Sequence, residues 1–266
     1  MPGLAGYIDG IGLIGPGLRD WSSAKALLTG DAPYVEQAAQ LPAADALPPA
    51  ERRRVGRPVR LALAVGAQAC LAAERDPASL PTVFTSSGAD GDICHEVCRM
   101  LAGNDRQISP TRFHNSVHNA PAGYWSIATG AMLPSISICA FDGSFGAGLL
   151  EALVQVSATR DTVLLIAYDT RYPEPLRRVR PIVDAFGIAL VLSQTPGRGA
   201  LGRVEAELTH DAFDVIADPP LELLRAGYPA ARALPMLIAV AGSRPSRNVL
   251  EYFDHLRLAV TTAPCR

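Results

Sequence analysis

The feature that most constrains the fold is a strand, a tight turn and a helix in direct succession. The β-branched run PSISICAF (134–141) predicts a strand, FDGS (141–144) a turn, and SFGAGLLEALVQVSA (144–158) a helix. A further apolar run, DTVLLIAYD (161–169), predicts the next strand. A strand that leads through a short turn into a helix and then into another strand is typical of a layered α/β protein.

Other segments continue this alternation. The remaining strands are predicted within 7–17, 81–88 and 187–193, and the remaining helices within 59–76, 92–103 and 115–130. Residues 41–58 carry prolines and a charge cluster, which predicts a surface connection. Beyond residue 200 the pattern weakens: VEAELTHDAFDV could be a strand, LPMLIAVAG is a short apolar element, and LRLAVTTA (256–263) predicts a closing strand. We expect a single α/β domain over residues 1–266.

The composition bounds the kind of partner. The chain is 48% hydrophobic and 19% charged, with a formal net charge of −2, which is typical of a soluble globular protein. Proteins that bind nucleic acid usually carry a clear basic excess, so we do not expect this chain to bind nucleic acid. The basic cluster Arg52, Arg53, Arg54, Arg57 and Arg60 is short, and we interpret it as a solvated face.

The sequence contains no uninterrupted apolar run of the roughly 18 to 20 residues that a membrane-spanning helix needs. The N-terminal stretch lacks a basic region and is broken by glycines, so no signal peptide is expected. The five cysteines are an odd number and are scattered, mostly through apolar segments. These features predict reduced thiols in a cytoplasmic protein, and no cofactor is expected.

The turn at 141–144 raises the question of a nucleophile. DGSFG (142–146) resembles the G-x-S-x-G elbow that presents a serine at a strand-to-helix turn, but Asp142 replaces the first glycine. Ser144 could act as a nucleophile, or it could cap a helix beginning at residue 145. We favour the cap.

Two pairs of side chains could suggest a metal. Cys94 and Cys98 stand one turn apart on the helix predicted at 92–103, on the apolar stripe that is expected to face the core. His114 and His118 have the same spacing but lack a carboxylate partner in sequence. No second pair with ligand spacing lies near the cysteines, and an imidazole that hydrogen-bonds only backbone is the commoner outcome. No metal site is expected.

The first predicted strand contains GIGLIG (10–15), which fits the dinucleotide-binding pattern G-x-G-x-x-G. The match stands alone, Pro16 and Gly17 follow it at once, and no second strand ends in an acidic residue about 20 positions later. We interpret the glycines as a tight turn that leaves the first strand.

The segment SPTRFHNSVHNAPAGYWSIATGAMLPSISICAFDGSF (109–145) resembles the N-terminal half of a β-ketoacyl synthase of the thiolase fold. Asn119, Ala122 and Gly123 match the family's V-N-x-x-A-G segment, and residues 134–138 match the start of its P-S-I-S-I-A-T-A-C motif. The resemblance covers residues 5–195 and leaves 196–266 unassigned. It implies a layered thiolase-like fold truncated to about the N-terminal half of a ketosynthase.

More narrowly, TSSGADGDICHEVCRMLAG and SPTRFHNSVHNAPAGYWSI resemble the half-length ketosynthase-like proteins of aryl polyene and xanthomonadin-type pigment clusters. Those proteins are regarded as chain-length-factor-like partners of a full ketosynthase. Counted without gaps from Pro134, the family's nucleophilic cysteine falls on Asp142, and Cys139 lies three residues earlier. A carboxylate is a much weaker nucleophile toward thioesters, so Asp142 is expected to meet the first amides of the following helix instead.

The resemblance also implies two catalytic histidines from a C-terminal half that this sequence does not contain, and His210 and His255 lie in no matching motif. We therefore expect a non-catalytic, chain-length-factor-like subunit that pairs with a full-length ketosynthase and serves acyl chains on an acyl carrier protein. A homodimer could form without that partner. The side chains expected at the subunit interface or acyl tunnel are Phe113, Tyr124, Trp125, Ile136, Ile138 and Phe141. The aromatic residues among 113–125 could equally be core residues.

Two other functions remain open. The chain could be a stand-alone acyltransferase or thioesterase that uses Ser144 or Cys139 with His118 as base, which requires nucleophile and base within hydrogen-bond reach. It could also be a homodimeric scaffold without chemistry.

Overall fold

The computed structural model describes residues 4–104 and 106–265. Its strands are β1 (Leu4–Ile14), β2 (Thr82–Thr85), β3 (Ser135–Ile138), β4 (Val163–Asp169), β5 (Phe186–Ser193), β6 (Gly202–Thr209), β7 (Ser246–Glu251) and β8 (Arg257–Ala263). Its α-helices are α1 (Trp21–Leu28), α2 (Pro49–Arg52), α3 (Arg57–Ala72), α4 (Gly91–Ala102), α5 (Pro110–Asn115), α6 (Ala120–Thr129), α7 (Ser144–Thr159), α8 (Leu176–Val179), α9 (Pro219–Gly227) and α10 (Leu234–Ala241). Short 3₁₀ helices are η1 (Pro77–Ser79), η2 (Phe141–Gly143) and η3 (Pro229–Ala233).

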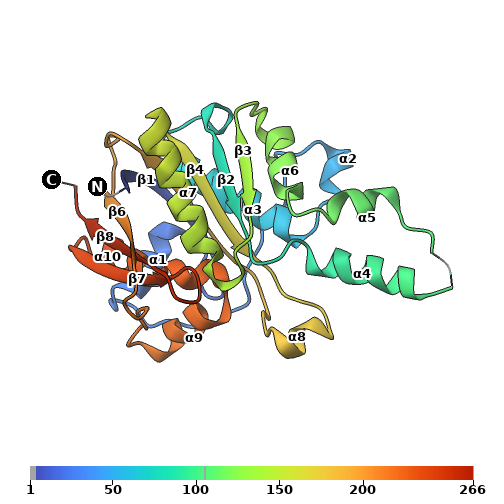
Figure 1. The fold of residues 1–266 in the computed structure, drawn as a ribbon. Helices are drawn as coiled ribbons and strands as arrows, with labels where there is room; N and C mark the ends of the chain where they lie inside the picture. The colour runs from blue at the N-terminus through green and yellow to red at the C-terminus, as the bar shows by residue number, and fades with distance from the viewer. Residues whose placement is uncertain (1–3, 105, 266) are drawn as a thin grey trace.

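All the described strands form one mixed sheet in the order β3-β2-β4-β5-β1-β6-β8-β7 (Figure 1). Strands β3, β2 and β4 run parallel, and every later pair in that order is antiparallel. Because the carboxyl ends of parallel strands meet at one edge of a sheet, the segments that follow β2, β3 and β4 are brought together. This edge carries the candidate site.

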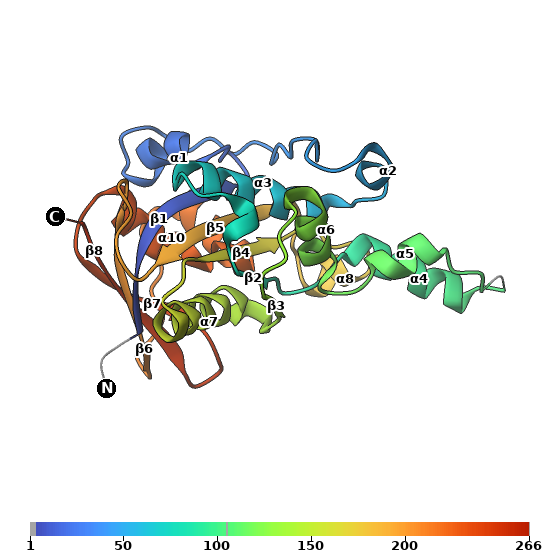
Figure 2. The ribbon, with the colours of Figure 1, turned by 90° about the horizontal axis from the view of Figure 1, so that it is seen from above.

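Helices cover both faces of the sheet (Figure 2). Strands β4 and β5 are buried at every position and send alternate side chains into two separate apolar clusters. One cluster contains the buried face of α3 and the aromatic residues of α6, and the other contains the buried faces of α7 and α10. A strand covered on both faces needs a nearly continuous apolar run, which is why 161–169 and 187–193 could be recognised in the sequence.

The glycines of β1 allow a helix to approach closely. A Cβ atom on Gly12 would lie 1.9 Å from the carbonyl oxygen of Val65, and one on Gly10 would lie 2.4 Å from that of Ala69. Both carbonyls belong to α3. The interpretation of these glycines as a turn was therefore wrong for Gly10 and Gly12, which lie inside the strand, while the turn itself follows at Gly15.

The predicted strands and helices up to residue 193 are confirmed, with shifts of a few residues at their ends. Among the less regular segments, VEAELT lies in β6, LPMLIAVA forms α10, and RLAVTTA forms β8. The sequence interpretation missed α1, α5, α8, α9 and β7, together with the short α2. The segment 41–58 is a connection that contains only the short α2 and the start of α3.

Helices α4 and α5, which together we call the arm, project from the body of the molecule (Figures 1 and 2). The apolar stripe of α4 was predicted to face the core, and this was wrong. None of the residues of α4 is buried, and Cys94 and Cys98 are both exposed. An ion pair of 2.9 Å between Glu96 and Arg112 joins the two helices to each other.

Within residues 4–104 and 106–265, no helix combines the length and the apolar character that crossing a bilayer requires.

Candidate functional site

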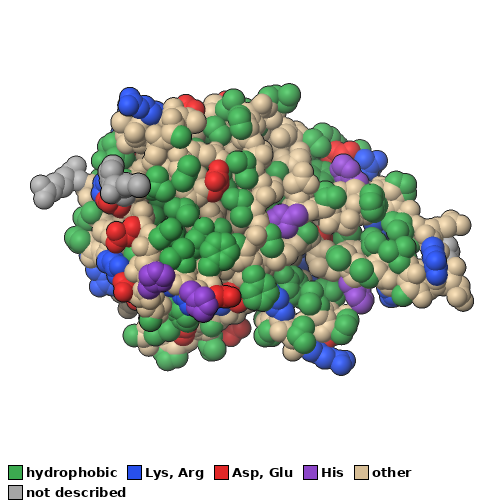
Figure 3. All heavy atoms as spheres, viewed as in Figure 1, with side chains coloured by type: hydrophobic (Ala, Val, Ile, Leu, Met, Phe, Trp, Pro, Cys, Tyr) green, Lys and Arg blue, Asp and Glu red, His purple; other side chains and the backbone are tan. Residues whose placement is uncertain are grey.

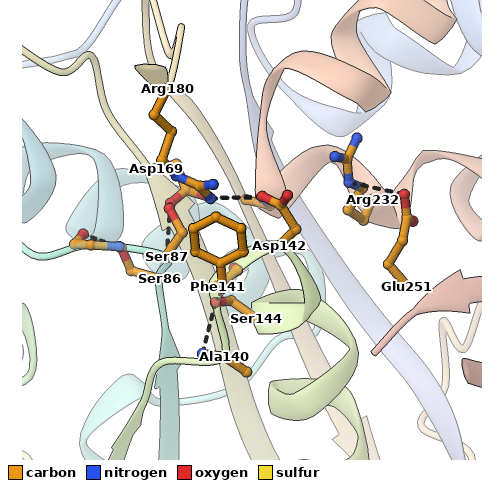
Figure 4. Close-up of polar contacts among 12 residues, drawn as sticks. Ser86, Ser87, Ala140, Phe141, Asp142, Ser144, Asp169, Arg180, Arg232 and Glu251 are labelled. Atoms are coloured by element: carbon orange, nitrogen blue, oxygen red, sulfur yellow. Dashed lines mark hydrogen bonds and ion pairs between the residues drawn. The ribbon is translucent and has the colours of Figure 1, made fainter. Parts of the chain in front are cut away.

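The candidate site lies where β2, β3 and β4 end, at the start of α7 (Figure 4). Ser86 and Ser87 follow β2, the turn from Cys139 to Gly143 follows β3, and Asp169 is the last residue of β4. The parallel pairing of these strands brings the three segments together from distant parts of the sequence. This is the position at which the sequence raised the question of a nucleophile.

The turn between β3 and α7 is held by Ser144. Its hydroxyl donates to the carbonyl oxygen of Phe141 at 2.7 Å and accepts from the amide of Ala140 at 3.1 Å. Ser144 is buried and is itself the first residue of α7, so its hydroxyl closes the preceding turn. The prediction that it caps the first amides of the helix was wrong, and both of its observed bonds go to backbone.

The turn also holds Phe141 in an uncommon backbone conformation. Its φ angle is +51°, in the left-handed region, which for a residue with a bulky side chain costs of order 1–2 kcal/mol. Phe141 as a whole is 63% exposed. Such a conformation persists only where the surrounding contacts impose it.

Asp142 forms an ion pair with Arg180, with 2.6 Å between Oδ1 and Nη2 (Figure 4). The Arg180 side chain is only 16% exposed, and its guanidinium also lies 3.7 Å from the centre of the Phe141 ring. The observed polar partner of Asp142 is thus Arg180 rather than the first amides of α7, which corrects the sequence expectation. A short charge-assisted contact of this kind fixes the position of the Asp142 carboxylate.

Asp169 is the buried acid of the site. Its Oδ1 accepts from the amide and hydroxyl of Ser87 at 2.9 and 2.6 Å, and its Oδ2 accepts from the amide of Ala230 at 2.8 Å. Burial raises the pKa of Asp169 to about 6, although these hydrogen bonds and the charge of Arg180 act in the opposite direction. The residue connects the ends of β2 and β4 to η3.

The C-terminal segments cover the first turn of α7. A Cβ atom on Gly143 would lie 2.0 Å from the carbonyl oxygen of Tyr252, and one on Gly146 would lie 2.6 Å from that of Glu251. The end of strand β7 therefore presses directly on the start of the helix. Glu251 in turn accepts from Arg225 at 2.7 Å and pairs with Arg232 at 3.2 Å.

Sequence reasoning missed Asp169, Arg180 and Arg232. The first was recognisable in principle, because an acidic residue that ends a buried strand is brought to the strand-end edge. The two arginines lie on irregular segments around α8 and η3, where the sequence has no periodic pattern. Nothing in the sequence could pair them with Asp142 or Glu251.

Cys139 and His118, the other candidates for acyl chemistry, also bond to backbone. Cys139 lies directly after β3, is exposed, and donates from Sγ to the carbonyl oxygen of Ser87 at 3.4 Å. The Nε2 atom of His118 lies 3.2 Å from the carbonyl oxygen of Ser86. An imidazole bonded to backbone was the expected outcome for His118. The observed hydrogen bonds of Cys139, Ser144 and His118 do not assemble a nucleophile and base.

In the described part of the chain, the two pairs considered as metal ligands, Cys94 with Cys98 and His114 with His118, are not part of a larger ligand cluster. The residues that the structure describes contain no cluster of three or more His, Cys, Asp or Glu side chains that could hold a metal ion. His114 lies near the end of α5 and His118 lies beyond it, so the two do not share a helix. His210 bonds through Nδ1 to the carbonyl oxygen of His255 at 2.7 Å, and both residues are exposed.

The predicted interface side chains fall into two groups. Tyr124 and Trp125 are buried within the chain, where the Tyr124 hydroxyl donates to Asn115 at 3.0 Å and the Trp125 ring contacts Phe84 edge-on. Those two are core aromatics, which was the alternative interpretation. The others remain on or near the surface: Phe113 is 61%, Phe141 63% and Ile136 39% exposed, and Ile138 is partly buried. Their contact with a partner stays a prediction.

Comparison with known proteins agrees with this architecture. The family model for the β-ketoacyl synthase N-terminal domain matches residues 20–215. A chain from a ketosynthase (ApeO) in complex with its chain length factor (ApeC) from Xenorhabdus doucetiae is 23% identical, with a TM-score of 0.71, and the match covers 97% of this chain and 99% of that one. No curated protein sequence matches significantly.

Two further solved structures share the fold. A chain from the ishigamide ketosynthase/chain length factor is 13% identical with a TM-score of 0.72, and the match covers 98% of this chain and 100% of that one. A chain from AntDE:AntF, a type II PKS acyl-carrier protein in complex with its ketosynthase bound to the hexaketide, is 12% identical with a TM-score of 0.73, covering 100% of both chains. The predicted thiolase-like layered fold is thereby confirmed. Since the family model covers more than half of its length, this chain belongs to the β-ketoacyl synthase family.

Proposed function

We propose that this chain is a non-catalytic, chain-length-factor-like subunit that pairs with a full-length β-ketoacyl synthase. The proposed complex elongates polyunsaturated acyl chains on an acyl carrier protein, in the manner of aryl polyene biosynthesis. The observation that carries the proposal is the occupation of the β3–α7 turn by Asp142 in an ion pair with Arg180.

The chemistry at this turn disfavours acyl transfer by the chain alone. A carboxylate attacks thioesters poorly, and an ion pair reduces its nucleophilicity further. The hydroxyl of Ser144 is buried and bonded on both sides to backbone, and the Tyr252 backbone lies against Gly143 at the start of the helix. The stand-alone acyltransferase or thioesterase would need a free nucleophile beside a base. No observed contact among the described residues supports that alternative.

The surface around β3 supports a protein partner. Strand β3 lies at the end of the sheet and pairs only with β2 among the described strands, so its other side offers unpaired backbone groups. Exposed strand edges of this kind invite pairing with another chain. Large hydrophobic side chains are exposed beside it and on the arm: Phe113, Val117, Ile127, Met132, Leu133, Ile136 and Phe141. Figure 3 shows hydrophobic side chains gathered on the face that carries α7, β3 and the arm.

The finer parts of the proposal rest on resemblance. The narrow likeness of TSSGADGDICHEVCRMLAG and the segment 109–127 favours the aryl polyene type of partner. One of the similar structures is a ketosynthase in complex with its chain length factor, and another is an acyl carrier protein in complex with its ketosynthase. We also propose that residues 1–266 form a single domain, because β6, β8 and β7 extend the same sheet. Five unpaired cysteines favour a cytoplasmic location.

The main test is co-expression with a full-length ketosynthase from an aryl polyene cluster, followed by size-exclusion chromatography with light scattering. We expect a 1:1 heterodimer. The matched variant Ile136→Asp should weaken that complex, because it places a charge beside the strand edge. A chain that stays a monomer, or forms the same homodimer with and without the ketosynthase, would contradict the proposal.

A second experiment tests the absence of chemistry. Isolated chain is incubated with acyl-carrier-protein thioesters and examined by intact-protein mass spectrometry for a covalent acyl group. We expect none on the wild type, on Ser144→Ala or on Cys139→Ala. Formation of an acyl-protein adduct that disappears in either variant would overturn the non-catalytic assignment.

A further inference from the structure

Phe141, in the turn between β3 and α7, combines an exposed side chain with an unusual backbone conformation. The residue is 63% exposed, yet its backbone adopts a left-handed φ of +51° that a bulky residue rarely takes. An exposed ring with a disfavoured backbone gains little from the chain's own core. The conformation therefore points to a use of the ring outside this chain.

Arg180 covers one face of that ring. The guanidinium carbon lies 3.7 Å from the ring centre, which is a close cation–π contact. The Arg180 side chain is 16% exposed, so solvent screens the contact only weakly. Asp142 fixes the same guanidinium through its 2.6 Å ion pair (Figure 4), while Phe141 itself remains 63% exposed.

The backbone under the ring is fixed as well. The hydroxyl of Ser144 donates to the carbonyl oxygen of Phe141, and Gly143 lies against the Tyr252 backbone with no room for even a Cβ atom. The turn therefore cannot move toward β7, and unwinding it would break the hydrogen bond between Ser144 and Phe141. Arg180 is the residue observed in contact with the ring itself.

We propose that Arg180 is a positioning residue and Asp142 its anchor, and that together they hold the Phe141 ring outward to contact apolar side chains of the partner ketosynthase. The inference rests on the proposed function for the identity of that partner. It gives the aspartate at the family's nucleophile position a role without chemistry. Phe141 follows the edge strand β3 by three residues, and both Phe141 and Ile136 of that strand are exposed.

The contact of Arg180 with the Phe141 ring, which we call the clamp, is tested first in the isolated chain. For this test 4-fluorophenylalanine is incorporated at position 141 and observed by ¹⁹F NMR. In the wild type we expect a shifted resonance from a ring held against the guanidinium. Arg180→Gln should move the resonance toward the value of a free ring, and Asp142→Asn should move it part of the way. Arg177→Gln is the matched control, because Arg177 pairs with Glu174 and has no observed contact with Phe141.

The second arm of the experiment measures binding of the full-length ketosynthase by the same variants. Arg180→Gln should raise the dissociation constant about tenfold, Arg180→Lys should restore part of the affinity, and Arg177→Gln should leave it unchanged. The melting temperature of each variant is recorded, and if Arg180→Gln does not fold, Asp142→Asn decides.

Identical spectra for wild type, Arg180→Gln and Arg177→Gln would overturn the clamp whether or not a partner binds. A moved resonance with unchanged partner affinity would overturn the interface role of Phe141. If the wild type binds no ketosynthase, the proposed function and the partner contact both fail, while the ¹⁹F result still decides whether Arg180 positions the ring.

Discussion

Helices α3 and α4 have similar sequence patterns but different positions in the molecule. Both carry apolar residues at helical spacing, and α3 buries nine of its residues against the sheet and α6. Helix α4 has a strongly one-sided distribution of apolar residues, yet none of its residues is buried. A periodic stripe shows that a helix has an apolar side, and the rest of the fold decides what covers it.

The difference lies in what the chain provides opposite each stripe. Helix α3 meets Gly10 and Gly12 of β1, whose missing side chains let the helix backbone approach the strand. Among the described helices and strands, α4 packs chiefly on α5, to which the Glu96–Arg112 ion pair joins it. The apolar side of α4 is thus not buried within this chain, which would suit a contact of the arm at the proposed subunit interface.

The largest expected effect comes from applying one substitution to both helices. Leu61→Ala in α3 removes a fully buried side chain and should lower the free energy of unfolding by about 2–5 kcal/mol. Leu101→Ala in α4 removes a side chain that is 47% exposed and should change it by no more than about 0.5 kcal/mol. Urea denaturation of the isolated chain measures both. Equal losses would show that the arm packs as tightly as the body does.

The same contrast explains how much of the fold the sequence could predict. Strands β4 and β5 were recognised because burial on both faces demands a continuous apolar run. Strand β7 was missed because SRNVLE is polar at most of its positions and lies at the free end of the sheet. Burial of the α4 stripe was wrongly predicted because periodicity is a local property, while the covering surface is set by tertiary structure.

The sequence predicted where the candidate site lies but not which residues contact one another there. The strand–turn–helix pattern correctly located the turn at 141–144, and the resemblance placed Asp142 there. The partner of Asp142 is Arg180, which lies 38 positions away on a segment without regular pattern. The tie between Asp169 and Ala230 spans 61 positions. Contacts of that separation depend on how the chain closes over the sheet, and a single sequence does not contain that information.

The second prediction concerns the buried carboxyl group of Asp169. Because the pKa of Asp169 is raised to about 6 in the folded chain, above its usual value near 4, the folded state binds the extra proton between these two values. Its contribution to stability is therefore fully present below about pH 4 and is lost as the pH rises through about 6, by up to about 3 kcal/mol.

The measurement compares wild type with Asp169→Asn by chemical denaturation from pH 4 to pH 7. The difference in unfolding free energy between the two should change over this window, because only the wild type titrates at this site. Asp92→Asn on the arm is the matched control, since its carboxylate is 40% exposed. A wild-type profile parallel to that of Asp169→Asn would contradict a raised pKa.

The third prediction tests whether the partner ketosynthase contacts the apolar side of α4. Val97→Asp places a charge on the apolar side of α4 and should weaken binding of the full-length ketosynthase at least tenfold, without lowering the melting temperature of the isolated chain. Leu71→Asp serves as control, because Leu71 is 82% exposed on α3, in the body of the molecule. Equal loss of affinity in both variants would place the partner surface elsewhere or make the effect nonspecific.

The smallest effect should appear in the reactivity of the thiols. Cys94 and Cys98 are exposed on the arm, whereas Cys70 is buried in α3, where burial and the nearby Asp76 raise its pKa to about 12. Partial burial and the neighbouring Cys98 raise the pKa of Cys94 too, but both arm thiols are accessible, so maleimide should label them within the folded chain and leave the buried Cys70 unlabelled until the chain unfolds. Peptide mapping by mass spectrometry resolves each site.

The labelling rates are then compared with and without the ketosynthase. Labelling of Cys94 and Cys98 should slow in the complex, because the partner covers the apolar side of α4. Cys265, which lies after β8 at the far end of the sheet from β3, should keep its labelling rate. Protection of Cys265 with continued labelling of the arm would mean that the partner binds the opposite edge of the sheet, and that the stripe of α4 has another occupant.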